Sequence, residues 1–296
     1  MKKSGDAAGM TRRQFGVMAG GLFAGYVFQG LCRVIDAAPS AQGRLTARPG
    51  ATPRESGTAG AGTHALGLAS PRDAILQLPR NASPGPVPLL VLLHGAGGGA
   101  GGVLRRVGEA AGEAGLGVLA PDSRGSTWDG IRDGFGADVM FLDRALARVF
   151  GMIAIDPARL AVGGFSDGAT YALSLGLING DLFRRVLAFS PGFIIDGSRH
   201  GRPRVFISHG KSDPILPIDH SSRAIVPGLR KDGYDVTYRE FDGRHEVPAA
   251  IAQEGMRWVA RSRQERRRDD QDMTCNKRMG EGETLSRICQ VVGRAS

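Results

Sequence analysis

The chain has 296 residues, of which 42% are hydrophobic and 23% are charged. This length and composition exclude a disordered polypeptide and allow one large core or two ordinary ones. The formal net charge of +9 lies mostly at the two ends, because residues 1–50 carry +5, residues 261–296 carry +3 and the middle is nearly neutral. A nearly neutral middle argues against a phosphate-binding surface, so we expect no nucleic-acid partner.

The first 50 residues have the features of an export signal and linker. Arg12 and Arg13 stand before Phe15, an apolar, glycine-rich stretch covers residues 15–31, and the small-residue stretch AAPSAQG follows. This order resembles a twin-arginine signal, which implies the twin-arginine export machinery as a partner and a periplasmic or secreted location. The alternative is an uncleaved membrane anchor through residues 15–31, which approach the lower length limit of a span.

The three cysteines all lie outside the middle of the chain, at Cys32, Cys275 and Cys289. No cysteine-ligated metal site can therefore be built in the core, and we expect neither a metal nor an organic cofactor. In an oxidising compartment Cys275 and Cys289 are able to pair with each other. Their segment, residues 263–296, has blocks of charge and little apolar periodicity, so it is predicted to be a basic, disordered tail.

Short apolar runs alternate with helical patterns between these ends. In chain order, strands are expected at 73–79, 88–95, 116–122, 159–165, 184–190, 204–210 and 235–241, and helices at 101–115, 136–152, 167–178, 220–233 and 246–263. Several of the strands are continuously apolar, as in strands covered on both faces. The alternation predicts one α/β domain over residues 51–262, with a mostly parallel sheet and helices on both faces.

A candidate nucleophile follows the strand at 159–165. Gly164-Phe165-Ser166-Asp167-Gly168 matches the G-x-S-x-G pattern, in which a sharp strand-to-helix turn exposes the serine hydroxyl. Glycine is favoured on both sides because a side chain would collide with the neighbouring strand or helix. The competing interpretation is a glycine-rich turn that happens to contain a serine, but the apolar strand before Ser166 and the helix after it favour the nucleophile.

A serine nucleophile requires a base and an acid that orients the base, and in this architecture they follow the serine in the order acid, then histidine. His245 directly follows the last expected strand, whereas His200, His209 and His220 lack that placement or an upstream acid. Asp213 follows the preceding strand and is the expected acid. Asp242 also ends a strand, but it is only three residues from His245 and is expected to shape the turn.

Acyl transfer also requires hydrogen-bond donors for the oxyanion. The glycine-rich stretch LHGAGGGAGG, residues 93–102, offers backbone N–H groups, and Ala96, with Gly95 or Gly97 as alternatives, is expected to act with Asp167. We expect His94 to brace this loop. A phosphate-binding loop is the rival interpretation, but the Lys-Ser/Thr ending is missing.

These segments together resemble a known family. Five stretches occur in order between about residues 70 and 260: LLVLLHGAGG, LAPDSRGSTWD, GFSDGATYALSLGL, VFISHGKSDPILP and FDGRHEVP. Together they resemble the phospholipase/carboxylesterase branch of the α/β-hydrolase superfamily. They are also similar to its dienelactone-hydrolase-like and polyester-depolymerase-like esterases. The resemblance implies an α/β-hydrolase fold, with Ser166, Asp213 and His245 as nucleophile, acid and base. It also implies that Trp128, together with Phe165, lines the substrate pocket.

The expected function is that of an exported serine esterase. The loops at 123–135 and 191–203 are too short for a separate cap domain, so we expect a shallow site for small esters or for exposed ester groups. The alternatives are a depolymerase or feruloyl-type esterase on a polymer, and a non-catalytic binding protein that kept the fold. Oligomeric state is left open by the sequence.

Overall fold

The computed structural model describes residues 39–50, 59–80 and 85–262. The predicted export motif, the apolar stretch at 15–31, the three cysteines and the C-terminal tail lie outside these ranges. None of the helices within them has the length and hydropathy of a bilayer span.

An eight-stranded sheet forms the centre of the domain, in the order β1-β2-β4-β3-β5-β6-β7-β8. The strands are β1 Gly62–Ala65, β2 Ala74–Leu78, β3 Val87–Leu93, β4 Gly117–Pro121, β5 Ile155–Phe165, β6 Arg185–Phe189, β7 Arg204–Gly210 and β8 Val236–Phe241. Strands β3 to β8 pair in parallel, whereas β2 runs antiparallel to both β1 and β4. The expectation of a mostly parallel sheet is confirmed.

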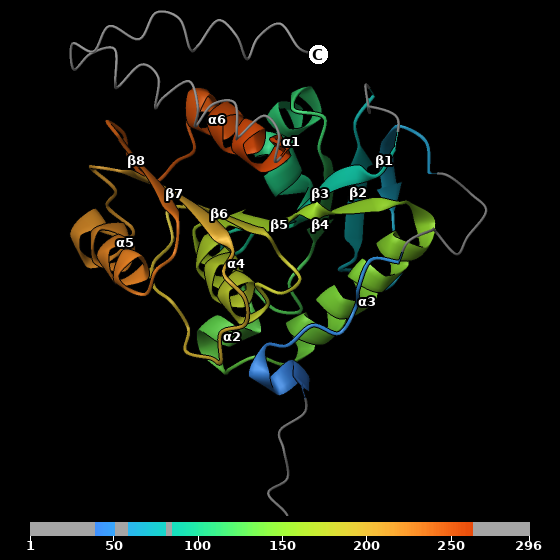
Figure 1. Cartoon of the computed structure of the whole chain (residues 1–296), viewed down its shortest axis with the longest axis horizontal. Helices are drawn as coiled ribbons and strands as arrows, with labels where there is room; N and C mark the ends of the chain where they lie inside the picture. The colour runs from blue at the N-terminus through green and yellow to red at the C-terminus, as the bar shows by residue number, and fades with distance from the viewer. Residues whose placement is uncertain (1–38, 51–58, 81–84, 263–296) are drawn as a thin grey trace, which may run out of the picture. The chain divides into compact units, whose positions relative to one another are not determined.

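Helices cover both faces of the sheet, as Figure 1 shows. They are α1 Ala100–Glu113, α2 Asp129–Arg132, α3 Ala137–Met152, α4 Asp167–Ile178, α5 Ser222–Lys231 and α6 Ala249–Ala260, with short 3₁₀ turns at Pro39–Gln42 and Ile218–His220. Helices α1 and α6 pack on one face, and α3, α4 and α5 pack on the other. In the described residues, the connections after the parallel strands contain these sheet-covering helices and otherwise only elements of a few residues. This part of the chain therefore forms no separate cap domain over the sheet edge.

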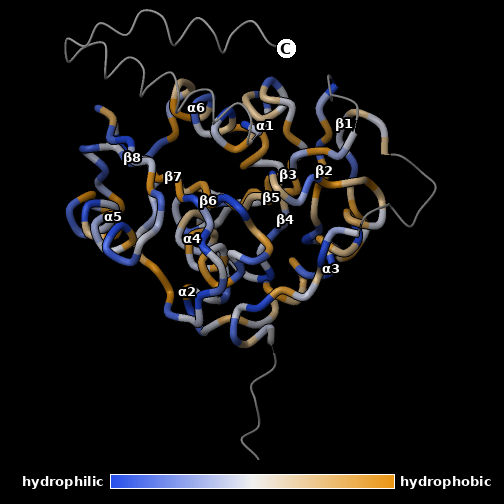
Figure 2. Tube along the Cα trace, in the orientation of Figure 1, coloured by the Kyte–Doolittle hydropathy of each residue, from blue (hydrophilic) through white to orange (hydrophobic). Residues whose placement is uncertain are grey.

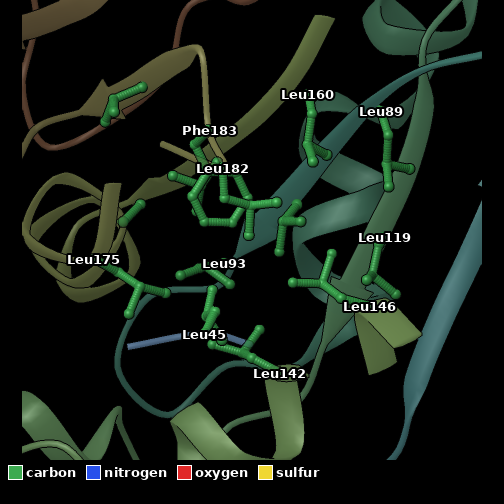
Figure 3. Packing of buried hydrophobic residues seen from close by; sticks show 14 of the residues in the cluster. Leu45, Leu89, Leu93, Leu119, Leu142, Leu146, Leu160, Leu175, Leu182 and Phe183 are labelled. Carbon is green, nitrogen blue, oxygen red and sulfur yellow. The ribbon is translucent and has the colours of Figure 1, made fainter. Parts of the chain in front are cut away.

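Side chains that alternate along β3 divide between two hydrophobic cores. Leu89 and Leu93 point into the larger core under α3 and α4 (Figure 3), whereas Leu90 and Leu92 belong to the core under α1 and α6. Because both faces are covered, β3 reads as a continuous apolar run rather than an alternating one. Figure 2 shows the resulting distribution, with hydrophobic segments mainly inside and hydrophilic segments mainly at the periphery.

Two features differ from the sequence-based expectations. Strand β1 was not expected, because it is a four-residue edge strand, GTHA, with half of its residues exposed and no apolar run. Residues 43–48, assigned to the linker, are instead attached to the domain: Leu45 is buried, its N–H donates to Asn179 Oδ1 at 2.9 Å, and Asn179 Nδ2 donates to Gly43 O at 2.7 Å. The ordered domain therefore begins before residue 51.

The turn from β5 into α4 is packed closely against the end of β3. A Cβ atom built on Gly168 would lie 2.2 Å from the carbonyl oxygen of Leu93, and one built on Gly164 would lie 2.4 Å from the carbonyl carbon and oxygen of Gly168. These neighbours are backbone atoms, which have no rotamer by which to move aside. Glycine at both positions is therefore what allows α4 to start directly against the end of β3.

We predict that Gly168→Ala destabilises the protein by about 3 kcal/mol or more, since overpacking against backbone forces the two elements apart. The matched control is Gly112→Ala in α1, where a new Cβ meets no atom within 4 Å and helix propensity improves. Urea unfolding followed by circular dichroism measures both. Equal stability of Gly168→Ala and the wild type would show that the close approach is not required.

Candidate active site

Three polar side chains from separate strand ends meet at one edge of the sheet. Ser166 follows β5, Asp213 follows β7 and His245 follows β8, so all three lie at the carboxyl ends of parallel strands. His245 Nε2 lies 2.9 Å from Ser166 Oγ, and His245 Nδ1 lies 2.6 Å from Asp213 Oδ2. The structure thus brings together the residues expected as nucleophile, acid and base in one hydrogen-bonded chain.

Ser166 has a backbone conformation that L-residues rarely adopt, with φ 58° and ψ −123°. Its N–H donates to Phe189 O at 3.0 Å, and its carbonyl accepts the N–H groups of Ala169 at 2.9 Å and Thr170 at 3.0 Å. Ser190, directly after β6, is the other non-glycine residue with positive φ in the described ranges. Strain of this kind costs about 1–3 kcal/mol and is concentrated at functional sites.

Asp213 is buried and is held as a carboxylate by several donors. Its Oδ1 accepts the N–H groups of Ile215 and Leu216, both at 2.9 Å, while Oδ2 faces His245. Burial alone would raise the pKa of Asp213, but the hydrogen bonds from Leu216, His245 and Ile215 outweigh burial, and the pKa lies below its ordinary value. Asp242, the rejected rival, has an exposed side chain paired with Lys211.

His209 is a second histidine on the same carboxylate, which sequence reasoning missed. Its Nε2 lies 2.8 Å from Leu216 O and 3.2 Å from Asp213 Oδ2. Both are acceptors, so Nε2 carries the proton and Nδ1 accepts from Ser222 Oγ at 2.7 Å. Burial lowers the pKa of His209, which keeps the ring neutral. The sequence signal for this contact is the position of His209 near the end of β7, four residues before Asp213. From the sequence, we weighed His209 only as a candidate base.

His94 holds the glycine-rich loop in the way expected. Its Nε2 accepts the N–H of Ser123 at 3.0 Å, so Nδ1 carries the proton and donates to Gly95 O at 2.8 Å. Burial, reinforced by the nearby Arg72 guanidinium, lowers the pKa of His94. The loop is further closed by the N–H of Gly97, which donates to Ser126 O at 2.7 Å. His94 is therefore a neutral structural brace.

The expected oxyanion donors come from two separate segments, the turn after β3 and the start of α4. Ala96 is exposed in the turn after β3, and no described residue accepts its N–H. Asp167 is the first residue of α4, where N–H groups have no partner within the helix. Gly95 packs directly against the serine, since a Cβ atom built on it would lie 3.3 Å from Ser166 Cβ.

Of the two expected pocket residues, the structure places only Phe165 at a cavity. Phe165 lines a cavity of about 530 Å³, and its ring centre lies 4.8 Å from that of His245. Trp128 is completely buried and its Nε1 donates to His94 O at 2.8 Å. The prediction that Trp128 lines the substrate pocket is wrong, because the indole packs beneath the glycine-rich loop and has no surface for a substrate.

The described ranges contain no group of three or more His, Cys, Asp or Glu side chains placed to hold a metal ion. The site just described is thus built from a hydroxyl, an imidazole, a carboxylate and backbone N–H groups.

The sequence of residues 136–259 matches the family model for phospholipases and carboxylesterases. This segment begins just before α3 and contains Ser166, Asp213 and His245. No curated protein sequence matches the chain significantly.

Solved structures of esterases and serine hydrolases share the fold. FphF, a fluorophosphonate-binding serine hydrolase of Staphylococcus aureus, is 16% identical over 69% of this chain and 100% of its own, with a TM-score of 0.57. A truncated carbohydrate esterase from gut microbiota is 13% identical over 70% of this chain and 98% of its own, with a TM-score of 0.55. Esterase PE8 is 22% identical over 62% of this chain and 95% of its own, with a TM-score of 0.50. Residues 136–259 are therefore similar to the phospholipase/carboxylesterase family, and the chain shares the fold of these esterases and serine hydrolases.

Proposed function

We propose that the protein is a carboxylic ester hydrolase that works through Ser166, His245 and Asp213 and an acyl-enzyme intermediate. The observation that carries this proposal is the continuous hydrogen-bonded chain from Asp213 Oδ2 to His245 Nδ1 at 2.6 Å and from His245 Nε2 to Ser166 Oγ at 2.9 Å. A strained serine at the start of a helix supports it, because the strain presents the hydroxyl at the sheet edge.

The carboxylate decides which imidazole nitrogen acts as the base. Asp213 is ionised and accepts, so the proton of neutral His245 resides on Nδ1 and the lone pair of Nε2 faces Ser166 Oγ. His245 removes the hydroxyl proton as Ser166 attacks the ester carbonyl, and then returns the proton to the departing alcohol. Water, deprotonated by the same nitrogen, then attacks the acyl carbon, the bond from this carbon to Ser166 Oγ breaks to release the acid, and His245 returns the proton to Ser166 Oγ.

Backbone N–H groups of Ala96 and Asp167 are proposed to bind the oxyanion that forms at each step. A single donor of this kind is typically worth about 2.7–4 kcal/mol in the transition state. The brace formed by His94 supports this role, because it fixes the carbonyl of Gly95 and so the peptide plane that carries the Ala96 N–H. Preorganised donors need no rearrangement when the charge develops.

Small esters, or ester groups exposed on a larger molecule, are the proposed substrates. No cap covers the sheet edge in the described residues, so a bulky substrate is not excluded by a lid. Two large apolar side chains, Phe193 and Ile215, are exposed on the connections after β6 and β7. Ile215 is two residues from Asp213, which places apolar surface for an acyl or alcohol group beside the site.

Replacing Ser166 by alanine is expected to lower kcat for 4-nitrophenyl acyl esters on the order of 10⁶-fold, since the nucleophile is lost while the fold is retained. Ser212→Ala, an exposed serine beside Asp213, is the control and should keep wild-type rates. A fluorophosphonate probe should add its mass to the Ser166-containing peptide only. Equal activity of Ser166→Ala and the wild type would refute the proposal, and inactivity of both folded proteins would favour a binding protein.

Asp213→Asn is expected to lower kcat by about 10⁴-fold, a loss of the size seen when a triad acid becomes an amide. The amide group donates to His245 Nδ1 and so moves the imidazole proton to Nε2, where it blocks the base. Asp242→Asn is the matched control, because Asp242 is exposed and only three residues before His245. Rates for both variants on one ester decide between the two acids, and a larger loss for Asp242→Asn would reverse the assignment.

We further propose that residues 1–40 direct export through the twin-arginine machinery. The support is the order of Arg12-Arg13, the weakly apolar stretch and the small residues in the sequence. Replacing both arginines by lysine should leave the protein in the cytoplasm, measured by fractionation and immunoblotting in a bacterial host. Membrane retention of the wild type, stable to high salt, would indicate instead the anchor through residues 15–31.

A further inference from the structure

The cavity of about 530 Å³ opens directly beside the candidate active site. Its lining includes Ala96, the proposed oxyanion donor, and Gly95, which packs against Ser166. Phe165, the residue before the serine, forms another part of the wall. Ser166, Asp213 and His245 do not line the cavity themselves, but Gly95 contacts Ser166 and the Phe165 ring lies 4.8 Å from that of His245, so the cavity adjoins the site.

Two arginines of α1 form part of the cavity wall. Arg105 and Arg106 both line the cavity and are exposed, and neither forms an ion pair with another described residue. Long helical side chains lean toward the helix N-terminus. Accordingly, a Cβ atom built on Gly101 would lie 3.4 Å from Arg105 Nη1, and Arg106 Cζ lies 4.7 Å from the ring centre of Phe165.

The charged side chains that line the cavity are both positive, and no carboxylate is among the lining residues. The rest of its lining is glycine, alanine, valine, phenylalanine and the neutral His94. Arg72 adds a third guanidinium at the edge, 3.3 Å from Gly98 O. Two carboxylates lie near this loop without lining the cavity: Asp122 accepts the N–H of Ala100 at 2.6 Å, and Asp167 accepts the hydroxyl of Thr127 at 2.6 Å. Since the middle of the chain is nearly neutral overall, this excess of positive charge is a local feature of the site.

The guanidinium groups are within reach of a small substrate. The Phe165 ring lies 4.7 Å from Arg106 Cζ and 4.8 Å from the His245 ring centre, so Arg106 and His245 are separated by no more than the sum of these distances. A chain of about four to six single bonds, each about 1.5 Å long, spans such a gap. One substrate can therefore place its carbonyl at Ser166 and a second group against the arginines.

We propose that this cavity is an anion-binding subsite, and that the preferred substrates are esters carrying a carboxylate or phosphate a few bonds from the scissile carbonyl. Guanidinium groups bind both anions through paired N–H donors, and in a partly enclosed site such bonds are stronger than in open water. This inference rests on the proposed ester hydrolysis and adds the class of substrate to it.

The test compares matched anionic and neutral esters on the full chain. The pairs are 4-nitrophenyl hemiadipate and 4-nitrophenyl hexanoate, 4-carboxyphenyl acetate and 4-carbamoylphenyl acetate, and 4-(phosphonooxy)phenyl acetate and 4-methoxyphenyl acetate. We expect a higher kcat/KM for the anionic member of at least one pair, and that pair identifies the anion and the half of the ester that carries it. The preference should act mainly through KM and weaken as salt is added.

The double variant Arg105→Gln/Arg106→Gln should lower the ratio of anionic to neutral kcat/KM in that pair at least about tenfold. Arg184→Gln is the matched control, since Arg184 is an exposed arginine just before β6, at the opposite edge of the sheet, and should leave the ratio unchanged. Hydrolysis of the neutral esters without any anionic preference, or a ratio unaffected by the double variant, would overturn the subsite. Failure to hydrolyse any of the esters would instead refute the proposed function.

Discussion

The close approach of α4 to the end of β3 is the constraint on which the site depends. The helix begins so near the Leu93 carbonyl that position 168 has no room for a Cβ atom. Because of this contact the chain must turn sharply between β5 and α4. The turn occurs at Ser166, which has a positive φ. The strained turn in turn holds the hydroxyl at the sheet edge, where His245 reaches it. The same contact thus packs α4 against the sheet and positions the hydroxyl of Ser166, the candidate nucleophile.

The hydrogen bonds of Asp213, His209 and His94 select one arrangement of protons around the site. Asp213 accepts from two backbone N–H groups and faces two histidines, so it remains ionised. His209 and His94 are both kept neutral by burial, and each has one nitrogen that donates and one that accepts. A network that is fully paired is rigid, whereas a half-paired one is costly in a low-dielectric interior. In the proposed reaction, His245 is the imidazole that carries the transferred proton.

Much of the fold, and the three candidate residues that meet at the sheet edge, were predictable from the sequence, because they rest on local patterns. The apolar runs of β3, β4 and β6 and the helix after Ser166 are continuous enough to be recognised without a partner. Strand β1 was not predictable, because GTHA has no apolar run and forms a strand only when β2 supplies the hydrogen bonds. The attachment of residues 43–48 depends on Asn179, more than 130 residues away. Contacts of that range leave no periodic signal.

The sequence by itself determined which residue types stand at the ends of successive strands, and the alternation of strands and helices placed those ends at one edge. Tertiary structure alone decided which side chains from distant segments contact one another. It buried Trp128 beneath the glycine-rich loop, although the sequence suggested a pocket residue. It also set His209 against Asp213 and turned Arg106 over Phe165. The physical reason is that backbone pattern dictates where a side chain starts, whereas packing against distant segments dictates where it ends.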